Sequence, residues 1–195
     1  MGKGQLTRNA VLDQAARTAS EVGLRGVTIG TLADLTHMSK SGLFAHFGSK
    51  ESLQLATLQH ARDRFVDVVI RPALAAPRGE PRVRALFECW LEWDTSELPG
   101  GCVFVAAAAE FDDEPGPVRD EIVRSQLELS DTIARVFRTG VDEGHFRVEA
   151  DAEQFAFDLK GIWLGYHHYS RLIADPLAAE RARRALDALL DAARP

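Results

Sequence analysis

Residues 28–50 read TIGTLADLTHMSKSGLFAHFGSK, and this stretch decides the fold. It holds two short apolar runs, and each follows a hydroxyl residue of the kind that caps helix N-termini, Thr28 and Ser39. A tight turn at His37 and Met38 separates the runs, and Gly48 ends the second one. Two short helices joined in this way form a helix-turn-helix, whose second helix enters the DNA major groove.

A packing helix precedes this unit. Leu12, Ala15, Ala16 and Ala19 recur at helical spacing, with Thr7 as the expected N-cap and Gly23 as the expected end. Four apolar side chains are expected to hold the two short helices together: Leu32, Leu35, Leu43 and Phe47.

Helical patterns continue to the end of the chain. Ser49 is expected to cap a long helix from Lys50 toward Ile70, after which Pro72, Pro77 and Gly79 break the chain. Further helices are predicted over residues 81–97, 102–111, 117–140 and 151–173, and a last one from the Asp175-Pro176 start signal. The prediction is therefore an all-α fold of about nine helices. A three-helix DNA-binding domain over residues 1–49 precedes a helical bundle over residues 50–195.

The amino-acid composition is that of an ordinary globular protein. The chain has 195 residues, of which 46% are hydrophobic and 27% charged, as in ordinary globular proteins. Apolar runs are too short to cross a bilayer, and no signal-peptide pattern opens the chain, so we expect a cytoplasmic protein without a membrane partner. Cys89 and Cys102 match no metal or disulfide framework, so neither a metal nor a cofactor is expected.

Charge is distributed unevenly along the chain. The net charge is −6, yet residues 1–62 carry seven basic and four acidic side chains. A basic head on an acidic body indicates that the head alone meets an anionic partner. The second short helix begins Ser39-Lys40-Ser41-Gly42, where small polar and basic residues allow close approach to phosphates and base edges.

The stretch from Thr7 to Leu53 resembles the N-terminal signature of the TetR family along its whole length, and the match extends through HFGSKESL at residues 46–53. The resemblance implies a dimeric regulator that binds double-stranded operator DNA. It implies DNA contacts by Thr28, Ser39, Lys40, Ser41, Gly42, Phe44, His46 and Lys50.

Two residues depart from the family pattern. His37 stands where the turn usually carries glycine, and Phe44 replaces a tyrosine whose hydroxyl normally reaches a phosphate. Lys50 opposes the dipole of its own helix, a placement that a nearby phosphate would compensate.

The body carries aromatic residues on four predicted helices. Most are expected to be core, but tryptophan and tyrosine also suit a partly polar cavity between helices, where bundles bind small molecules. The candidate effector site comprises Phe87, Trp90, Trp93, Phe104, Phe111, Phe137, Trp163, Tyr166 and His167. His167 and His168 are adjacent and cannot act as a helical metal pair.

The last two helices are the expected dimer interface. Gly161 and Gly165 would leave a flat strip where another helix can approach closely. The candidate interface comprises Phe157, Gly161, Leu164, Gly165, His168, Ala182, Leu186 and Leu189.

The favoured hypothesis is a homodimeric repressor released from a palindromic operator by a small apolar or amphipathic effector. An activator or a ligand-insensitive regulator is the alternative within regulation. A helical enzyme is disfavoured because no catalytic constellation can be placed, and an architectural protein would bind DNA without sequence preference.

Overall fold

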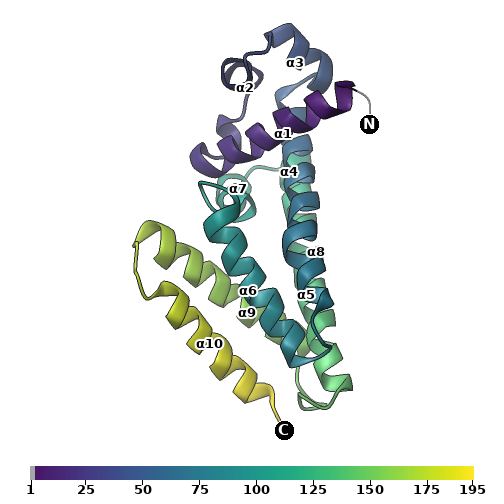
Figure 1. The fold of residues 1–195 in the computed structure, drawn as a ribbon, viewed down its shortest axis with the longest axis vertical. Coiled ribbons are helices and arrows are strands. Elements are labelled where there is room, and N and C mark those ends of the chain that lie inside the picture. The colour runs from purple at the N-terminus through teal and green to yellow at the C-terminus, as the bar shows by residue number, and fades with distance from the viewer. Residues whose placement is uncertain (1–2) are drawn as a thin grey trace. The chain divides into compact units, whose positions relative to one another are not determined.

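The computed structural model describes residues 3–195, which are helices joined by short loops (Figure 1). This confirms the predicted all-α class. The α-helices are α1 Lys3–Val22, α2 Ile29–Thr36, α3 Lys40–Phe47, α4 Lys50–Phe65, α5 Arg71–Ala75, α6 Glu80–Glu92, α7 Val103–Phe111, α8 Pro117–Asp142, α9 Ala152–His167 and α10 Ala178–Ala193. The chain divides into two compact units, Met1–Phe65 with Thr95–Ser125, and Val66–Asp94 with Gln126–Pro195.

The first unit contains the predicted helix-turn-helix. The stripe on α1 is buried as expected, with Leu12, Ala15, Ala16 and Ala19 all at most 5% exposed. Two expectations fail here. Thr7 lies inside α1, which already begins at Lys3, and Leu35 is 51% exposed. Leu32, Leu43 and Phe47 are buried as expected, and Leu35 is not.

Four residues predicted to begin or end helices do so in the structure: Gly23, Ser39, Gly48 and Ser49. Gly23 follows α1 with a φ of 83°, which glycine adopts without strain. Ser39 Oγ accepts the Gly42 N–H at 3.1 Å, and Ser49 Oγ accepts the Ser52 N–H at 3.0 Å. Gly48 is the C-cap of α3. Short-range hydrogen bonds therefore set both ends of the second helix.

Pro72 does not end the long helix, contrary to expectation. A π-helical segment, Val66–Ile70, follows α4, and α5 continues to Ala75 with Pro72 in its first turn. Proline lacks the N–H that would bond four residues back, and a first turn tolerates that loss. The chain leaves the helix only before Pro77 and Gly79.

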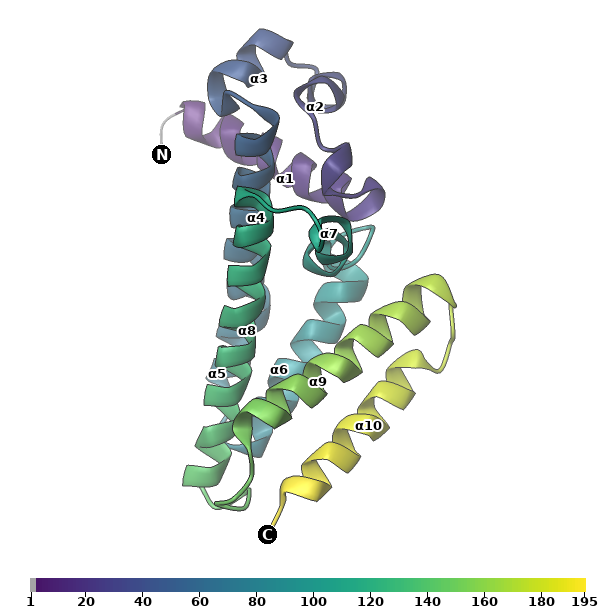
Figure 2. The same ribbon diagram turned by 180° about the vertical axis from the view of Figure 1, so that it is seen from behind.

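The second unit packs α9 along α10, and the two helices run side by side in both views (Figures 1 and 2). Asp151 caps α9 by accepting the N–H groups of Glu153 and Gln154. The predicted start of the last helix is too early. Asp175 Oδ1 accepts the Leu177 N–H in a turn, and α10 begins at Ala178.

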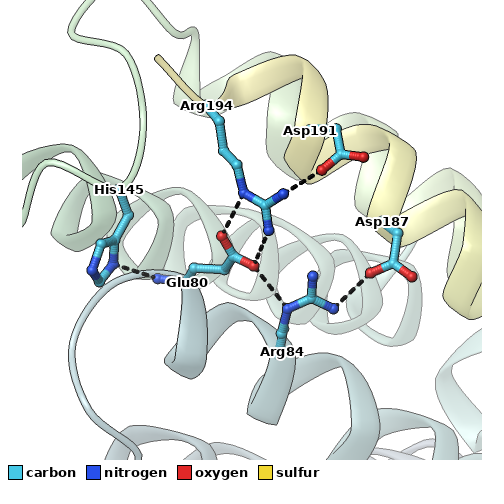
Figure 3. A network of polar contacts seen from close by, with 6 residues as sticks. All are labelled: Glu80, Arg84, His145, Asp187, Asp191 and Arg194. Atoms are coloured by element: carbon cyan, nitrogen blue, oxygen red, sulfur yellow. Dashed lines mark hydrogen bonds and ion pairs between the residues drawn. The ribbon is translucent and has the colours of Figure 1, made fainter.

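A polar network ties α6 to the end of α10 (Figure 3). It comprises Glu80, Arg84, His145, Asp187, Asp191 and Arg194. The Glu80 carboxylate accepts hydrogen bonds from Arg194 at 2.6 and 3.0 Å and from Arg84 at 2.9 Å. The hydrogen bonds from Arg194, followed by those from Arg84, hold the pKa of Glu80 below its ordinary value, against the opposing effect of burial.

Over residues 3–195, none of the helices combines the length and apolar character that a membrane span requires.

Candidate nucleic-acid interface and effector site

The outer face of α3 presents small polar and basic side chains. Ser39, Lys40 and Ser41 are exposed at its N-terminus, while Leu43 and Phe47 anchor the helix from beneath. The hydroxyls of Ser39 and Ser41 lie 3.2 Å apart. A helix N-terminus carries unpaired N–H groups and positive potential, so this end of α3 can receive a phosphate or a base edge.

The remaining predicted contact residues surround this helix end. Phe44 is 59% exposed, so the side chain that replaces the family's tyrosine lies on the surface. His46 is partly buried beside the Phe47 ring, with ring centroids 6.1 Å apart. Lys50 is exposed in the first turn of α4. These positions leave Phe44 and Lys50 accessible to a DNA backbone.

Thr28 closes a capping box with Thr31. Its hydroxyl accepts the Thr31 N–H at 3.1 Å, and its own N–H donates to the Thr31 hydroxyl at 2.9 Å. This arrangement fixes the start of α2. His37 adopts a left-handed φ of 55° in the turn, which is costlier for histidine than for glycine.

A carboxylate on α7 fixes the loop in front of α2. Glu110 accepts the backbone N–H groups of Leu24 and Arg25, each at 2.9 Å. The Arg25 guanidinium lies over the Phe111 ring, 4.9 Å from its centroid, and pairs with Glu114. The sequence contains no local sign of this anchor, because Glu110 lies 86 residues from Leu24.

Among the predicted effector residues, one cluster forms in the second unit. Trp90 on α6 stacks on Trp163 of α9 at 4.8 Å, and Tyr166 meets Trp90 edge-on at 6.2 Å. Trp163 is buried, and its indole Nε1 has no hydrogen-bond partner among the described residues. His167 Nδ1 lies 2.7 Å from Asp94 Oδ1.

The other predicted aromatic effector residues are also buried. Phe137 stacks between Phe146 and Phe155, at 4.5 and 4.2 Å, in a closed aromatic core. Phe87 and Trp93 are buried. Phe104 and Phe111 belong to the first unit, where Phe104 packs edge-on against Phe65.

Two known protein families match this chain. Residues 11–57 match the family described as bacterial regulatory proteins, tetR family, and residues 79–186 match the tetracyclin repressor-like C-terminal domain. The chain belongs to the TetR family. It is a DNA-binding transcriptional regulator.

Individual relatives agree with this assignment. The chain is 24% identical to the HTH-type transcriptional regulator BetI of Burkholderia mallei, over 98% of this chain and 95% of that protein. It is 26% identical to a TetR regulator from Chloroflexus aurantiacus, with a TM-score of 0.86 over 98% of this chain and 96% of that one.

A third similarity is to a structure described as AibR in complex with isovaleryl coenzyme A and operator DNA. It has a TM-score of 0.66 and 23% identity, over 81% of this chain and 84% of that one. This likeness concerns the fold.

Within this TetR regulator, the predicted dimer residues divide into two groups. On α9, Phe157 is 73% exposed and Leu164 52% exposed, and a Cβ added at Gly161 or Gly165 would meet no atom within 4 Å. His168 is exposed beside them. On α10, however, Ala182 and Leu186 are buried by this chain itself, and Leu189 is partly exposed.

Sequence reasoning missed two polar groups of the second unit, Lys160 and Asp94. Lys160 Nζ on α9 donates to the Gln126 carbonyl at 3.2 Å and to Ser130 Oγ at 3.1 Å. Asp94 has a fully buried side chain. The sequence carries no local signal for Lys160, because its two hydrogen-bond partners lie 30 and 34 residues away. In the part of the chain that the structure describes, no cluster of three metal-ligating side chains occurs.

Proposed function

We propose that this TetR regulator is a repressor that binds a near-palindromic operator as a homodimer and leaves it when a small apolar or amphipathic molecule enters its body. The observation that carries the effector part is the buried Trp163 indole without a hydrogen-bond acceptor, set in an aromatic cluster. Buried polar groups in proteins are nearly always hydrogen-bonded. A bound molecule would supply the missing acceptor.

The α3 surface supports the DNA part of the proposal. We assign base contacts to Ser39, Lys40, Ser41 and Gly42, at the N-terminus of the second helix of the motif. Phosphate contacts are assigned to Lys50 and to the neighbourhood of Thr28 and His46. Phe44 would contact the DNA backbone through its ring alone, because it has no hydroxyl.

The exposed face of α9 supports the homodimer. Phe157, Gly161, Leu164, Gly165 and His168 form a strip on which a second copy can pack, and monomeric proteins rarely expose such apolar surface. A groove of about 340 Å³ runs between α9 and α10 and includes Gly165 and Ala185. Because Ala182 and Leu186 are already buried, we propose that α10 contributes only its margin, including Leu189.

Release of DNA requires the effector to distinguish two states of the dimer. A molecule that binds both states equally cannot shift their populations. The fold neighbour AibR is described in complex with isovaleryl coenzyme A and operator DNA, and this likeness of fold is in line with a chain that binds both a small molecule and DNA.

The test begins with the operator. Selection from a random DNA pool by the purified protein should recover a near-palindromic site. Amphipathic and aromatic compounds are then screened by tryptophan emission, because all three tryptophans lie in the second unit. Hits should release the selected operator from the wild type and less well from Trp90→Ala and Trp163→Phe.

Two results would contradict parts of this proposal. Equal release from every folded tryptophan variant would place the effector elsewhere. Failure of a broad screen to yield any releasing compound would favour the ligand-insensitive alternative.

A further inference from the structure

Lys160 on α9 is partly buried, and its ammonium group forms hydrogen bonds within the second unit. Its Nζ donates to the Gln126 carbonyl and to Ser130 Oγ, both on α8. These two partners are neutral, and the structure gives Lys160 no carboxylate partner within residues 3–195. An ammonium group has three N–H donors, so one remains for another acceptor.

Burial without a counterion is unfavourable for a cation. Desolvation by burial lowers the pKa of Lys160, and no nearby acid opposes that change. Lys160 is partly buried, and no carboxylate pairs with it among the described residues. The site therefore has an uncompensated positive charge.

A second unsatisfied donor lies on the same face of α9. Trp163 is three residues after Lys160, and side chains at that spacing are neighbours on a helix. Its Nε1 is buried and without an acceptor among the described residues. The Trp90 ring stacks against it at 4.8 Å, which provides an apolar wall.

One acidic side chain, Asp94, contacts the next turn of α9. His167, seven residues after Lys160, lies 2.7 Å from Asp94 Oδ1, so that carboxylate is already engaged. The face of α9 thus combines a cation, an indole N–H and a flat aromatic surface. An anionic acceptor with an apolar body would complement this combination.

We propose that the effector is a small amphipathic carboxylate whose anionic group binds Lys160 and whose apolar part lies against the Trp90–Trp163 stack. This inference rests on the proposed function and names the chemical class of its effector. Lys160 supplies the charge that separates carboxylates from neutral molecules of the same shape. Trp163 supplies apolar contact and a second donor.

The experiment uses a matched pair of probes, octanoate and octanamide, which differ in charge and share one apolar chain. Each is titrated into the full-length protein by calorimetry, with tryptophan emission as a second signal. The wild type should bind octanoate about 10- to 100-fold more tightly than octanamide, the range expected for a hydrogen bond to a charged group.

Three variants sharpen the test. Lys160→Met should abolish the preference for octanoate, and Lys160→Arg should retain most of it. Arg184→Met removes one positive charge from an exposed position on α10 and should leave the preference unchanged. Circular dichroism checks that each variant is folded, and the wild-type comparison stands even where a variant does not fold.

Equal affinity of the wild type for the two probes would overturn the proposal, as would an absence of octanoate binding or a preference that survives in Lys160→Met. These results leave the proposed function intact if a neutral compound still releases the operator. Failure of every compound to release the operator would instead contradict the proposed function, whatever octanoate does.

Discussion

The segment 28–50 and the face of α9 around Lys160 are built on different principles. In the first, each helix end is fixed by a residue within three positions, as Ser39 with Gly42 shows. In the second, the defining contacts join residues far apart in sequence, 30 positions for Lys160 with Ser130 and 73 for His167 with Asp94. The proposed DNA-contact surface can therefore be recognised locally, whereas the proposed effector site depends on the assembled fold.

The same contrast extends to exposure. Ser39, Lys40 and Ser41 are exposed to solvent, and the side-chain hydrogen bonds of the two serines stay within the same helix end. Trp163 is buried and its Nε1 has no acceptor among the described residues, whereas Lys160 is partly buried and bonds two neutral partners on α8.

Gly165→Arg should convert the dimer into a monomer. The position is open within this chain, so the arginine fits the folded protomer but obstructs a second helix. Operator affinity should fall about a hundredfold or more, because the two reading heads no longer act together. Sedimentation measures the assembly state, and Ala188→Arg, on an exposed position of α10, is the control. A dimer of undiminished affinity would place the interface elsewhere.

Much of the first unit could be predicted from sequence, and the exceptions are instructive. Thr28, Ser39 and Gly48 were identified because caps and stops act over a few residues. Leu35 was misjudged because its apolar character fits a core position but the assembled unit leaves it exposed. Glu110 had no signal, since its hydrogen bonds reach across 86 residues.

The second unit could be predicted only in outline. The helix predicted over residues 151–173 is present as α9 and the π-helical turn after it, whereas the stacking of Trp90 on Trp163 is seen only in the assembled fold. Phe137 was assigned to an effector site, but it stacks in a closed cluster with Phe146 and Phe155. Lys160 was overlooked because a single lysine on a helix is ordinarily solvated, and only the packing of α8 reveals its environment.

Glu110→Gln tests whether the first unit depends on a distant contact after all. The substitution removes the charge that receives two backbone N–H groups and leaves one amide oxygen to accept them. Unfolding free energy should fall by about 1–3 kcal/mol, the range for hydrogen bonds to charged groups. Hydrogen exchange should accelerate at the amides of Leu24 and Arg25.

The control for this prediction is Glu114→Gln, which removes only an exposed ion pair with Arg25. Exposed pairs contribute little, so its effect should stay below about 1 kcal/mol. Similar losses of unfolding free energy in both variants would show that the hydrogen bonds of Glu110 contribute no more to stability than the exposed ion pair of Glu114.

Lys50→Ala should weaken binding to all DNA sequences alike. The exposed ammonium at the start of α4 is assigned to a phosphate, and losing it should lower the salt slope by about one unit. Fluorescence anisotropy over a range of salt concentrations measures both quantities. Ser41→Ala provides the contrast, because a base contact would change the sequence preference. A salt slope unaltered in Lys50→Ala would remove that residue from the interface.

Phe44→Tyr should tighten operator binding by roughly 0.5–1.5 kcal/mol, the net value of one hydrogen bond. Phe44 is 59% exposed, so the added hydroxyl meets solvent in the free protein and a phosphate in the complex. Anisotropy titration against the selected operator compares the two proteins. Weaker binding by the tyrosine variant would show that the ring packs against DNA where a hydroxyl is not accommodated.

Glu80→Gln should have the smallest effect, and its dependence on pH identifies the cause. Arg194 and Arg84 lower the pKa of Glu80 in the folded protein below the ordinary value of 4.5. The ionised carboxylate therefore stabilises the fold fully above pH 4.5, and this contribution disappears as the pH falls through the lowered pKa. Because the partner arginines are substantially exposed, the loss at neutral pH should be about 1 kcal/mol or less.

Thermal unfolding of wild type and Glu80→Gln from neutral pH to about pH 3 measures this difference. The two melting temperatures should differ at neutral pH and converge on acidification. Glu149→Gln, at an exposed loop position, should show no such convergence. A difference that stays constant across the titration would mean that Glu80 acts through packing, and that the network joining α6 to α10 in Figure 3 contributes little through its charge.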